Sequence, residues 1–280
     1  MRDNAIEANL KTKHLALKRN LAEMGSAVLA LSGGVDSALL LAVGKEALGD
    51  SIVAATARSP LYPQSVVRRA VELTQQLDVE HVILDSNELD DPQFTSNPPE
   101  RCYLCKLELY SRLDRLAREG GVATVIDGTQ LDDTADYRPG MVAAAEFGVR
   151  SPLLEVGFTK EEVRVLSREL GLETWDIPAG PCLASRVPYS EEITPDKLAA
   201  IEQGEEFLDK LGFREVRIRF VKERTARIEI SPDCIPKLTD ETIREKVICK
   251  MKELGFLYIT LDLEGYRSGS LNAVLENEGL

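Results

Sequence analysis

The chain has 280 residues, and its 34 Lys and Arg stand against 47 Asp and Glu, which gives a formal net charge of −13. This acidic balance excludes the overall positive field with which proteins hold nucleic acid or an anionic membrane surface, so a small-molecule substrate is expected. The composition is 44% hydrophobic and 29% charged, which excludes disorder, and no apolar run approaches the ~18 residues of a membrane span.

The N-terminal segment mixes charged residues with apolar ones. A secretory signal has an unbroken apolar run instead, so we expect a cytoplasmic protein with no membrane partner. In that reducing compartment the five cysteines are expected to be thiols, metal ligands or catalytic groups rather than structural disulfides.

The first two thirds of the chain predict alternating strands and helices. Apolar residues spaced four and three apart predict an amphipathic helix from Leu10 to Leu21. Thr159 and Glu162 predict a capping box at the start of a later helix that ends near Gly171. Between them we expect strands at 27–32, 52–56, 81–85 and 122–127 and helices at 37–48, 64–77 and 102–119. This rhythm is typical of the α/β class with a doubly wound parallel sheet, whose ligands bind at the carboxyl ends of the strands.

Residues 173–190 are rich in Pro and Gly and predict an irregular functional loop that also links two domains, 1–185 and 186–280. The second domain is expected to be a smaller α/β unit that supplies substrate contacts and an oligomer surface. Its expected elements are helices at 195–211 and 239–254 and strands at 215–220, 226–230 and 257–261.

The most informative segment is Ser32-Gly33-Gly34-Val35-Asp36-Ser37, between a predicted buried strand and a predicted helix. Two glycines let the backbone approach an anion, and backbone N–H groups, two serine hydroxyls and the helix N-terminus converge on it. A carboxylate at Asp36 suits such a place if Mg²⁺ lies between it and a polyphosphate. A plain Gly-Gly turn is the structural alternative, and the segment lacks the Lys of a Walker A loop.

This segment resembles the SGGxDS PP-loop of the ATP pyrophosphatases, which adenylate a substrate oxygen and release pyrophosphate. Further segments make the chain similar to the LarE family, the sulfur transferases of nickel-pincer nucleotide biosynthesis. They are Asp127-Gly128-Thr129, Asp132-Asp133, Asp136 to Gly140, Cys182 to Tyr189, Val216 to Arg219, Leu261 to Leu263 and Tyr266 to Gly269. The similarity covers nearly the whole chain and implies an adenine nucleotide alpha hydrolase-like PP-loop domain followed by the smaller domain.

The resemblance implies an ATP-dependent sulfurtransferase that forms AMP and pyrophosphate. In the family, ATP adenylates the pyridinium carboxylates of a dicarboxylate mononucleotide, and sulfur then replaces the activated oxygen. The finished nucleotide holds nickel in lactate racemase and related enzymes. The resemblance therefore implies ATP, Mg²⁺, this mononucleotide and a sulfide donor as ligands, and homo-oligomers, which the family forms as hexamers built from trimers of dimers.

The resemblance also implies a role for each site residue. Nucleotide and phosphate binding is assigned to Ser32, Gly33, Gly34, Asp36, Ser37, Asp127, Gly128, Arg217 and Arg219, the two arginines holding the substrate phosphate. Catalysis of sulfur transfer is assigned to Cys182, Lys106, Ser185, Arg186 and Glu205. From the residues alone, Asp127 could cap a turn, the two arginines could be a solvated strand edge, and Glu205 could be a solvated helix position.

Some family members give up the sulfur of one loop cysteine, but here Pro181 stands at that position and Cys182 follows it. Cys102 and Cys105 form a C-x-x-C pair at a predicted helix start, where positions i and i+3 share a face and thiolates are favoured. Lys106 adds positive charge. Spacing alone leaves a redox dithiol, a structural zinc site and no function open for this pair.

The three-cysteine pattern resembles the cluster-bearing branch of the family. It implies a [4Fe–4S] cluster held by Cys102, Cys105 and Cys182, with one iron open to external sulfide. Cys234 and Cys249 have apolar neighbours near helical positions, so we interpret them as buried free cysteines without chemistry.

Three other functions compete with this interpretation. A tRNA or other small-molecule thiolation enzyme could use the same PP-loop and cysteines, but a chain of charge −13 without an added Lys/Arg-rich domain is unlike a tRNA-binding protein. An amide-forming synthetase would need a glutaminase domain, whose nucleophile signature is not found in the sequence. A nucleotide sensor would not convert ATP to AMP and pyrophosphate.

Overall fold

The computed structural model describes residues 2–135, 139–178, 180 and 182–267. The chain forms two compact units, Met1–Glu88 with Glu100–Gly180, and Leu89–Pro99 with Pro181–Leu280. Six residues that the sequence analysis singled out lie outside the described ranges, namely Asp136, Tyr137, Arg138, Pro181, Ser268 and Gly269. Compact packing does not test independent folding, so the domains 1–185 and 186–280 stay a prediction.

The first unit is built on a parallel sheet with the strand order β3-β2-β1-β4. Its strands are β1 (Ala27–Ala30), β2 (Ile52–Arg58), β3 (Glu80–Asp85) and β4 (Thr124–Ile126). Its helices are α1 (Arg2–Ala22), α2 (Val35–Leu48), α3 (Gln64–Gln76), α5 (Arg101–Glu119), α6 (Pro139–Glu146), α7 (Pro152–Val156) and α8 (Lys160–Glu169).

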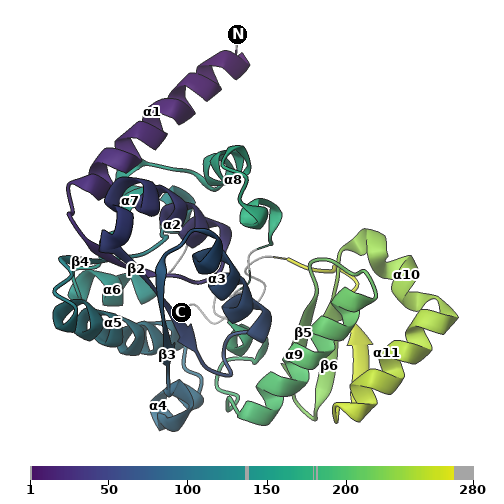
Figure 1. Ribbon diagram of the computed structural model, residues 1–280. Coiled ribbons are helices and arrows are strands. Elements are labelled where there is room, and N and C mark those ends of the chain that lie inside the picture. Colours follow the sequence, from purple (N-terminus) through teal and green to yellow (C-terminus); the bar gives the residue numbers. More distant parts are fainter. Residues whose placement is uncertain (1, 136–138, 179, 181, 268–280) are drawn as a thin grey trace. The chain divides into compact units, whose positions relative to one another are not determined.

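Helices cover both faces of this sheet (Figure 1). Successive residues of a strand point to opposite faces, and in β1 Leu29 enters the core formed with α1, α2, α3, α7 and α8, whereas Val28 enters the core formed with α5 and α6. Both residues are fully buried, as is Ala54 on the Leu29 side of the sheet. Burial on both faces explains why β1 is a continuous apolar run, and it confirms the predicted doubly wound α/β fold.

Helix starts differ from the sequence prediction by small and explicable amounts. α2 begins at Val35 rather than Ser37 because Gly34, with extended dihedral angles, is its N-cap. Asp36 therefore lies in the first turn of a helix, near its positive end. At α8 the expected capping box is present, since Thr159 accepts from the Glu162 backbone and Glu162 accepts from the Thr159 backbone. The short helices α6 and α7 were not predicted, because few residues carry their periodicity.

The second unit has a three-stranded sheet in the order β5-β6-β7. β5 (Arg217–Val221) is antiparallel to β6 (Thr225–Glu229), and β6 is parallel to β7 (Tyr258–Leu261). The helices are α4 (Pro92–Thr95), α9 (Pro195–Lys210), α10 (Ile235–Thr239) and α11 (Glu241–Glu253). Its core includes the buried side chains Ile201, Ile218, Ile228 and Met251. This is the smaller α/β unit that the sequence predicts.

Residues 89–99 also belong to the second unit, although they are distant in sequence from the rest of it. The fully buried amide of Asn97 donates to the carbonyl oxygens of Val187, Pro188 and Glu191, at 3.2, 2.6 and 3.1 Å. Because these bonds span about ninety residues of sequence, chain-order reasoning gives no sign of them. Residues 89–99 thus belong to the second unit although both neighbouring segments belong to the first.

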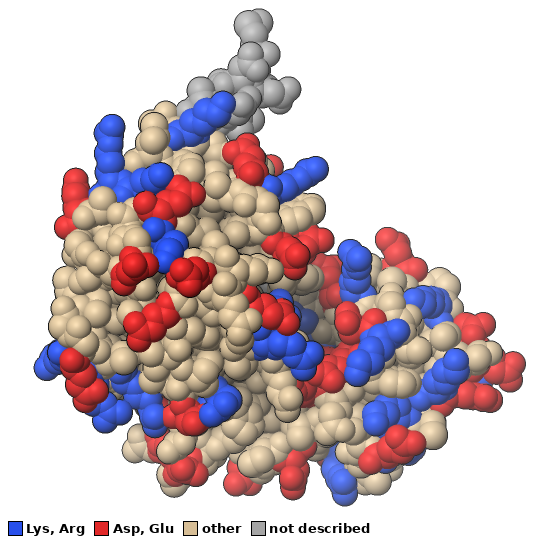
Figure 2. All heavy atoms as spheres, viewed as in Figure 1, with Lys and Arg blue, Asp and Glu red and all other residues tan. Residues whose placement is uncertain are grey.

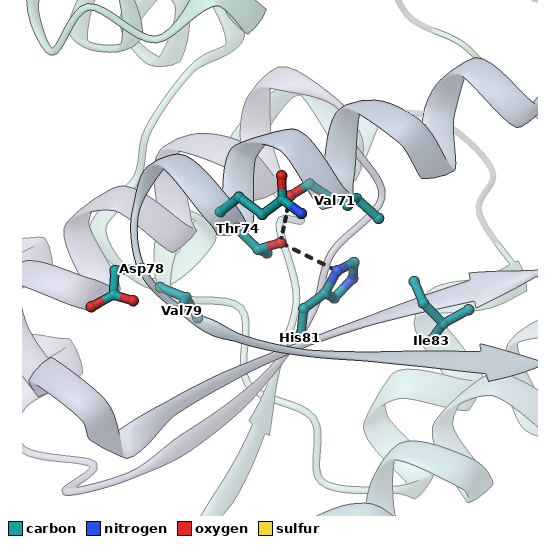
Figure 3. Close-up of a pocket in the computed structure, with 7 residues that line it drawn as sticks. Val71, Thr74, Asp78, Val79, His81 and Ile83 are labelled. Carbon is teal, nitrogen blue, oxygen red and sulfur yellow. Dashed lines mark hydrogen bonds between the residues drawn. The ribbon is translucent and has the colours of Figure 1, made fainter.

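A pocket of about 530 Å³ lies between α3 and β3 in the first unit, and Figure 3 shows His81 pointing at Thr74 inside it. His81 Nδ1 lies 3.2 Å from Thr74 Oγ1, and His81 Nε2 lies 2.9 Å from Thr56 Oγ1. Thr56 donates its only hydroxyl proton to the carbonyl of Leu31, so Nε2 of His81 must be the donor toward Thr56. Burial lowers the pKa of His81. A neutral imidazole with its proton on Nε2 therefore supports the strand end that leads into the predicted PP-loop.

No helix among the described residues combines the length and the apolar character needed to cross a membrane.

Candidate functional site

The predicted PP-loop is a compact turn between β1 and α2. Ser32 Oγ lies 3.0 Å from Ser37 Oγ, and the Ser32 backbone N–H donates to Ser37 Oγ at 3.2 Å. Gly33 has φ +66°, and a Cβ there would lie 2.7 Å from the carbonyl oxygen of Val66, so only glycine fits. Gly34 gives α2 no side-chain cap. The first N–H groups of α2 consequently face a loop that suits an anion.

One carboxylate oxygen of Asp36 is hydrogen-bonded, and the other has no hydrogen-bond partner. Its Oδ2 accepts from Lys160 Nζ at 2.6 Å, whereas its Oδ1 is buried and has no hydrogen-bond partner. Burial raises the pKa of Asp36, and the charge of Lys160 opposes that shift. A buried carboxylate oxygen without a donor needs an explanation, and a bound cation is one that matches the chemistry of the group.

Asp127 holds the chain that follows β4. Tyr110 Oη donates to Asp127 Oδ2 at 2.8 Å, and Ser151 Oγ and the Thr129 backbone N–H donate to Oδ1 at 2.7 and 3.1 Å. Burial and the charge of Asp127 raise the pKa of Tyr110, which keeps its hydroxyl a donor. Three hydrogen-bond donors of the protein thus bind the Asp127 carboxylate. This geometry is that of a residue that caps a turn, which was one of the two interpretations that the sequence allowed for Asp127.

Gly128 places that turn directly on the PP-loop. A Cβ at Gly128 would lie 2.9 Å from the backbone nitrogen of Ser37 and 3.2 Å from the carbonyl carbon of Asp36. Real Cβ atoms do not come that close to backbone, so the approach requires glycine. The structure therefore brings the Asp127-Gly128 segment and the PP-loop together, as the carboxyl edge of a parallel sheet predicts.

Two further acids of the motif lie at this edge. Asp132 Oδ2 accepts from the Lys160 backbone N–H at 2.7 Å, and the charge of Asp133 raises the pKa of Asp36. Asp36 and Asp132 both bind Lys160, and Asp133 adds negative charge near Asp36. This edge of the sheet thus holds three carboxylates and one ammonium group.

The C-x-x-C pair begins α5. Cys102 is exposed, whereas Cys105 is buried, donating to Glu88 Oε1 at 3.7 Å and lying 3.4 Å from Tyr62 Oη. Burial raises the pKa of Glu88, whose Oε2 has no hydrogen-bond partner. Lys106 follows, with Nζ 5.4 Å from the ring centroid of Tyr110. These contacts place Lys106 one helical turn from the tyrosine that binds Asp127.

Within the described residues, no group of three or more His, Cys, Asp and Glu side chains is arranged to hold a metal. Cys102 and Cys105 belong to the first unit and Cys182 belongs to the second. The thiols are suitable donors for iron, but the ligand set of a cluster stays a prediction.

In the second unit a buried ion pair ties the Cys182 loop to the sheet. Arg186 is 2% exposed, and its Nε and Nη2 donate to the two oxygens of Glu205 at 3.0 and 2.9 Å. Its Nη1 donates to Ser185 Oγ at 2.9 Å and to the Cys182 carbonyl at 3.2 Å. Glu205 Oε1 also accepts from the backbone N–H of Ile218 at 2.9 Å. Glu205 is therefore not a solvated helix residue.

Arg217 and Arg219 complete this group, which we call the arginine cluster: Arg186, Arg217 and Arg219 with Glu205 and Glu229. Arg219 donates to Glu229 at 3.0 Å and to the Ser185 carbonyl at 2.6 Å. The Arg217 guanidinium lies 5.0 Å from the ring centroid of Tyr266. Both arginines are buried, which excludes a solvated strand edge. Burial, followed by the charge of Arg186, lowers the pKa of Arg217. Three cations against two carboxylates make a site that favours an anion.

Sequence reasoning missed Lys160 and Glu88 and misjudged one cysteine. A signal for Lys160 existed, because a basic residue in the first turn of a helix opposes the helix dipole. Glu88 carried none, since an acid after a strand is ordinary. Cys249 is exposed on α11 and donates to Glu253, so its interpretation as a buried cysteine is wrong; Cys234 is half-buried.

Comparisons with known proteins agree with the PP-loop. The family model described as NAD synthase matches residues 9–104. An uncharacterised protein of Synechocystis sp. is 44% identical over 95% of this chain and 99% of its own length. The pyridinium-3,5-bisthiocarboxylic acid mononucleotide synthase of Lactiplantibacillus plantarum is 38% identical over 96% of each chain. A GMP synthase of Aeropyrum pernix is 31% identical over 64% of this chain and 38% of its own length. The likeness to the mononucleotide synthase covers nearly the whole of both chains, so the chain belongs to the LarE family of ATP-dependent PP-loop sulfurtransferases.

Proposed function

We propose that this protein adenylates the pyridinium carboxylates of a dicarboxylate mononucleotide with ATP and replaces the activated oxygen by sulfur, in nickel-pincer nucleotide biosynthesis. The observation that carries the proposal is the identity of 38%, over 96% of both chains, to a relative whose name is pyridinium-3,5-bisthiocarboxylic acid mononucleotide synthase. A match to the first unit alone would support only the PP-loop chemistry, whereas this match covers both units.

The nucleotide site is proposed to comprise Ser32, Gly33, Gly34, Asp36, Ser37, Asp127 and Gly128. Mg²⁺ would bind Asp36, whose buried Oδ1 has no hydrogen-bond partner and whose carboxylate is the ligand type that Mg²⁺ prefers. The ion neutralises polyphosphate charge when bound. Asp127 is proposed to act indirectly, because its contacts to Tyr110 and Ser151 fix the turn that carries Gly128.

The substrate phosphate is proposed to bind Arg217 and Arg219. A guanidinium pairs with phosphate through two parallel hydrogen bonds, and removal from water strengthens each bond. Arg219 shares its charge with Glu229, whereas the lowered pKa of Arg217 reflects burial beside other arginines. An arriving phosphate would relieve that repulsion. This electrostatic argument supports a phosphate site in the arginine cluster.

Sulfur transfer is proposed to use Cys182, Lys106, Ser185, Arg186 and Glu205. The Arg186–Glu205 pair, with the bonds from Arg186 to Ser185 and to the Cys182 carbonyl, supports a role in fixing the cysteine loop. Cys102, Cys105 and Cys182 would ligate a [4Fe–4S] cluster with an iron open to sulfide, making sulfur transfer catalytic rather than sacrificial. Thiol chemistry supports this ligand set.

The remaining expectations are part of the proposal: an external sulfide donor, a cytoplasmic location, a homo-oligomer, and the domains 1–185 and 186–280. The alternative, a PP-loop tRNA or other small-molecule thiolation enzyme, has no comparable support. Figure 2 shows Lys and Arg interspersed with Asp and Glu on the face in view, without a broad basic patch there. Together with the net charge of −13 this disfavours tRNA as the sulfur acceptor.

Anaerobically purified protein, supplied with ATP, Mg²⁺, sulfide and pyridinium-3,5-dicarboxylate mononucleotide, tests the function. We expect AMP and pyrophosphate together with a thiocarboxylate product. Formation of ADP and orthophosphate would overturn the adenylation, and sulfur transfer to tRNA alone would favour the alternative.

The sulfur source is tested on the same preparation by iron and sulfide analysis and by mass spectrometry of the Cys182 peptide. Catalytic transfer predicts bound iron, many turnovers and an intact Cys182. A single turnover with loss of H₂S from Cys182 would establish sacrifice instead, and zinc without iron would exclude the cluster.

A further inference from the structure

We propose that Thr56 is a positioning residue for nucleotide binding at the PP-loop. Its hydroxyl group fixes the peptide group between Leu31 and Ser32, with which the PP-loop begins, and His81 orients that hydroxyl group. Thr56 does this without touching the nucleotide itself. The proposal rests on the function proposed above in one respect, that the PP-loop binds Mg·ATP.

A chain of hydrogen bonds runs from β3 to the start of the PP-loop. His81 Nε2 donates to Thr56 Oγ1 at 2.9 Å, and Thr56 Oγ1 donates to the Leu31 carbonyl oxygen at 2.9 Å. The Leu31 carbonyl and the Ser32 N–H belong to one peptide group, which is planar and nearly rigid. That N–H donates to Ser37 Oγ at 3.2 Å. A hydroxyl group in β2 therefore controls a peptide group whose other end binds a serine of the PP-loop.

This contact lies where the chain leaves the sheet. β1 ends at Ala30, and the N–H group of Leu31 still donates to the Ala55 carbonyl oxygen at 2.8 Å. The carbonyl group of Leu31 accepts from a side chain, that of Thr56. Thr56 thus extends the hydrogen bonding of the sheet by one peptide group, up to the first residue of the PP-loop.

The residue type at position 56 is the second argument. β2 lies inside the sheet, between β1 and β3, and Thr56 is only 2% exposed. Valine has the same shape as threonine and is usual in a buried parallel strand. A buried hydroxyl group lowers stability unless it is hydrogen-bonded, so the two hydrogen bonds of Thr56 explain why a threonine is tolerated there.

The PP-loop also has little room to absorb a shift of the peptide group that Thr56 holds. A Cβ on Gly33 would lie 2.7 Å from the Val66 carbonyl oxygen, and a Cβ on Gly128 would lie 2.9 Å from the backbone nitrogen of Ser37. Backbone atoms therefore confine the loop near both of its ends. Because closely packed groups transmit strain, a rotation of the peptide group would move the N–H groups of the loop.

Thr74 provides a matched control on the other side of the His81 ring, where Figure 3 shows their hydrogen bond. Thr74 is also 2% exposed, and its Oγ1 lies 3.2 Å from His81 Nδ1. The carbonyl oxygens within its reach are those of Ala70 and Val71, at 3.0 and 2.9 Å. These carbonyls lie within α3 rather than at the PP-loop. The two threonines thus share residue type, burial and the contact to His81, and they differ in the carbonyl groups that they bind.

The test measures two quantities in Thr56→Val, Thr74→Val and the unaltered protein: the dissociation constant of the magnesium complex of α,β-methylene-ATP, by calorimetry, and the midpoint of urea unfolding. Each substitution keeps the shape of the side chain and removes one buried hydroxyl group, so both should lower the midpoint of unfolding. In Thr56→Val we expect the nucleotide to bind roughly 10-fold more weakly, whereas Thr74→Val should change its dissociation constant by no more than about 2-fold. Thr56→Ser keeps the hydroxyl group and should bind the nucleotide within about 3-fold of the unaltered protein.

Weaker nucleotide binding in Thr56→Val alone, although both valine variants lose stability, distinguishes positioning of the PP-loop from a structural role. Equal weakening in the two valine variants, an unchanged dissociation constant in Thr56→Val, or weak binding by Thr56→Ser would each overturn the proposal. If Thr56→Val does not fold, Thr56→Ala and Thr74→Ala replace the pair, and the same difference is required of them. Release of ADP and orthophosphate by the unaltered protein would overturn the proposed function while leaving this comparison of affinities valid, so the two failures are distinguishable.

Discussion

The PP-loop edge and the arginine cluster have opposite charge balances. At the PP-loop, Asp36, Asp132 and Asp133 outnumber Lys160, and one oxygen of Asp36 has no partner. In the arginine cluster, three guanidinium groups outnumber the carboxylates of Glu205 and Glu229. The first region therefore favours a cation and the second favours an anion. A net charge of −13 describes neither region, which teaches that ligand preference follows local rather than total charge.

The largest effect is expected at the PP-loop edge, from removing the charge of Asp36. Asp36→Asn keeps the shape of the side chain but removes the charge that holds Mg²⁺, so pyrophosphate release should fall by at least ~100-fold. The measurement is pyrophosphate formed in a single turnover. Asp50→Asn, which removes the acid of the exposed Lys45–Asp50 pair, is the control and should retain full activity. Equal activity of the two variants would refute the metal role of Asp36.

The next largest effects are expected in the arginine cluster, where Arg217 and Arg219 should contribute differently to stability. Arg219→Ala leaves Glu229, which is 1% exposed, with only Arg227 as its ion-pair partner among the described residues, and should lower the free energy of unfolding by about 3 kcal/mol. Arg217→Ala breaks no ion pair of this kind; it removes a cation over Tyr266, which contributes about 1 kcal/mol, and a hydrogen bond to the Val216 carbonyl, which contributes about 1 kcal/mol, so a smaller loss is expected. Urea unfolding measures both.

Substrate binding should order the same two variants differently. Each arginine is expected to contribute ~1.5–3 kcal/mol to phosphate binding, so Arg217→Ala should weaken mononucleotide binding roughly 10- to 100-fold while costing less stability than Arg219→Ala. Calorimetric titration with the mononucleotide supplies the affinity. Unchanged affinity in the double variant would remove both arginines from the substrate site.

A smaller effect is expected where the chain after β4 meets the PP-loop. Gly128→Ala puts a methyl group 2.9 Å from the Ser37 backbone nitrogen, so one of the two segments must shift. We expect a loss of about 1–3 kcal/mol in the free energy of unfolding and weaker ATP binding. Gly121→Ala is a poor control because of its positive φ, whereas Gly180 meets nothing within 4 Å and Gly180→Ala should be neutral. A neutral Gly128→Ala would contradict the close approach.

The smallest effect concerns acid stability at the pocket edge. Because burial lowers the pKa of His81 below its ordinary value of 6.5, the unfolded chain binds a proton more readily than the folded one. The stabilising contribution is complete above about pH 6.5 and is lost as the pH falls through the lowered pKa. His81→Gln should therefore lose less stability than the unaltered protein between pH 7 and pH 5, as measured by urea unfolding. An identical loss in both would show that His81 is not the titrating group.

Local sequence patterns predict the parts of this molecule that depend on neighbours in the chain. The apolar run of β1, the Thr159 capping box and the Gly33-Gly34 turn are all such features, and each is present. Lys160 on Asp36 and Arg186 on Glu205 depend on residues 124 and 19 positions apart, which periodicity does not encode. Glu88 beside Cys105 is of the same kind. The family resemblance predicted that Arg186 and Glu205 are site residues, whereas no feature of the sequence indicated the position of Glu88.

The segment 89–99 determines how this protein can be divided into fragments. The chain passes between its two units at Glu88–Leu89, at Pro99–Glu100 and again at Gly180–Pro181. A gene divided at codon 186 would leave Asn97 on the first fragment and the three carbonyl groups that it binds on the second. The second fragment would then expose those carbonyls, and adding a peptide of residues 89–99 should restore its stability. Dissection of this enzyme therefore calls for a two-piece complementation experiment rather than a simple truncation.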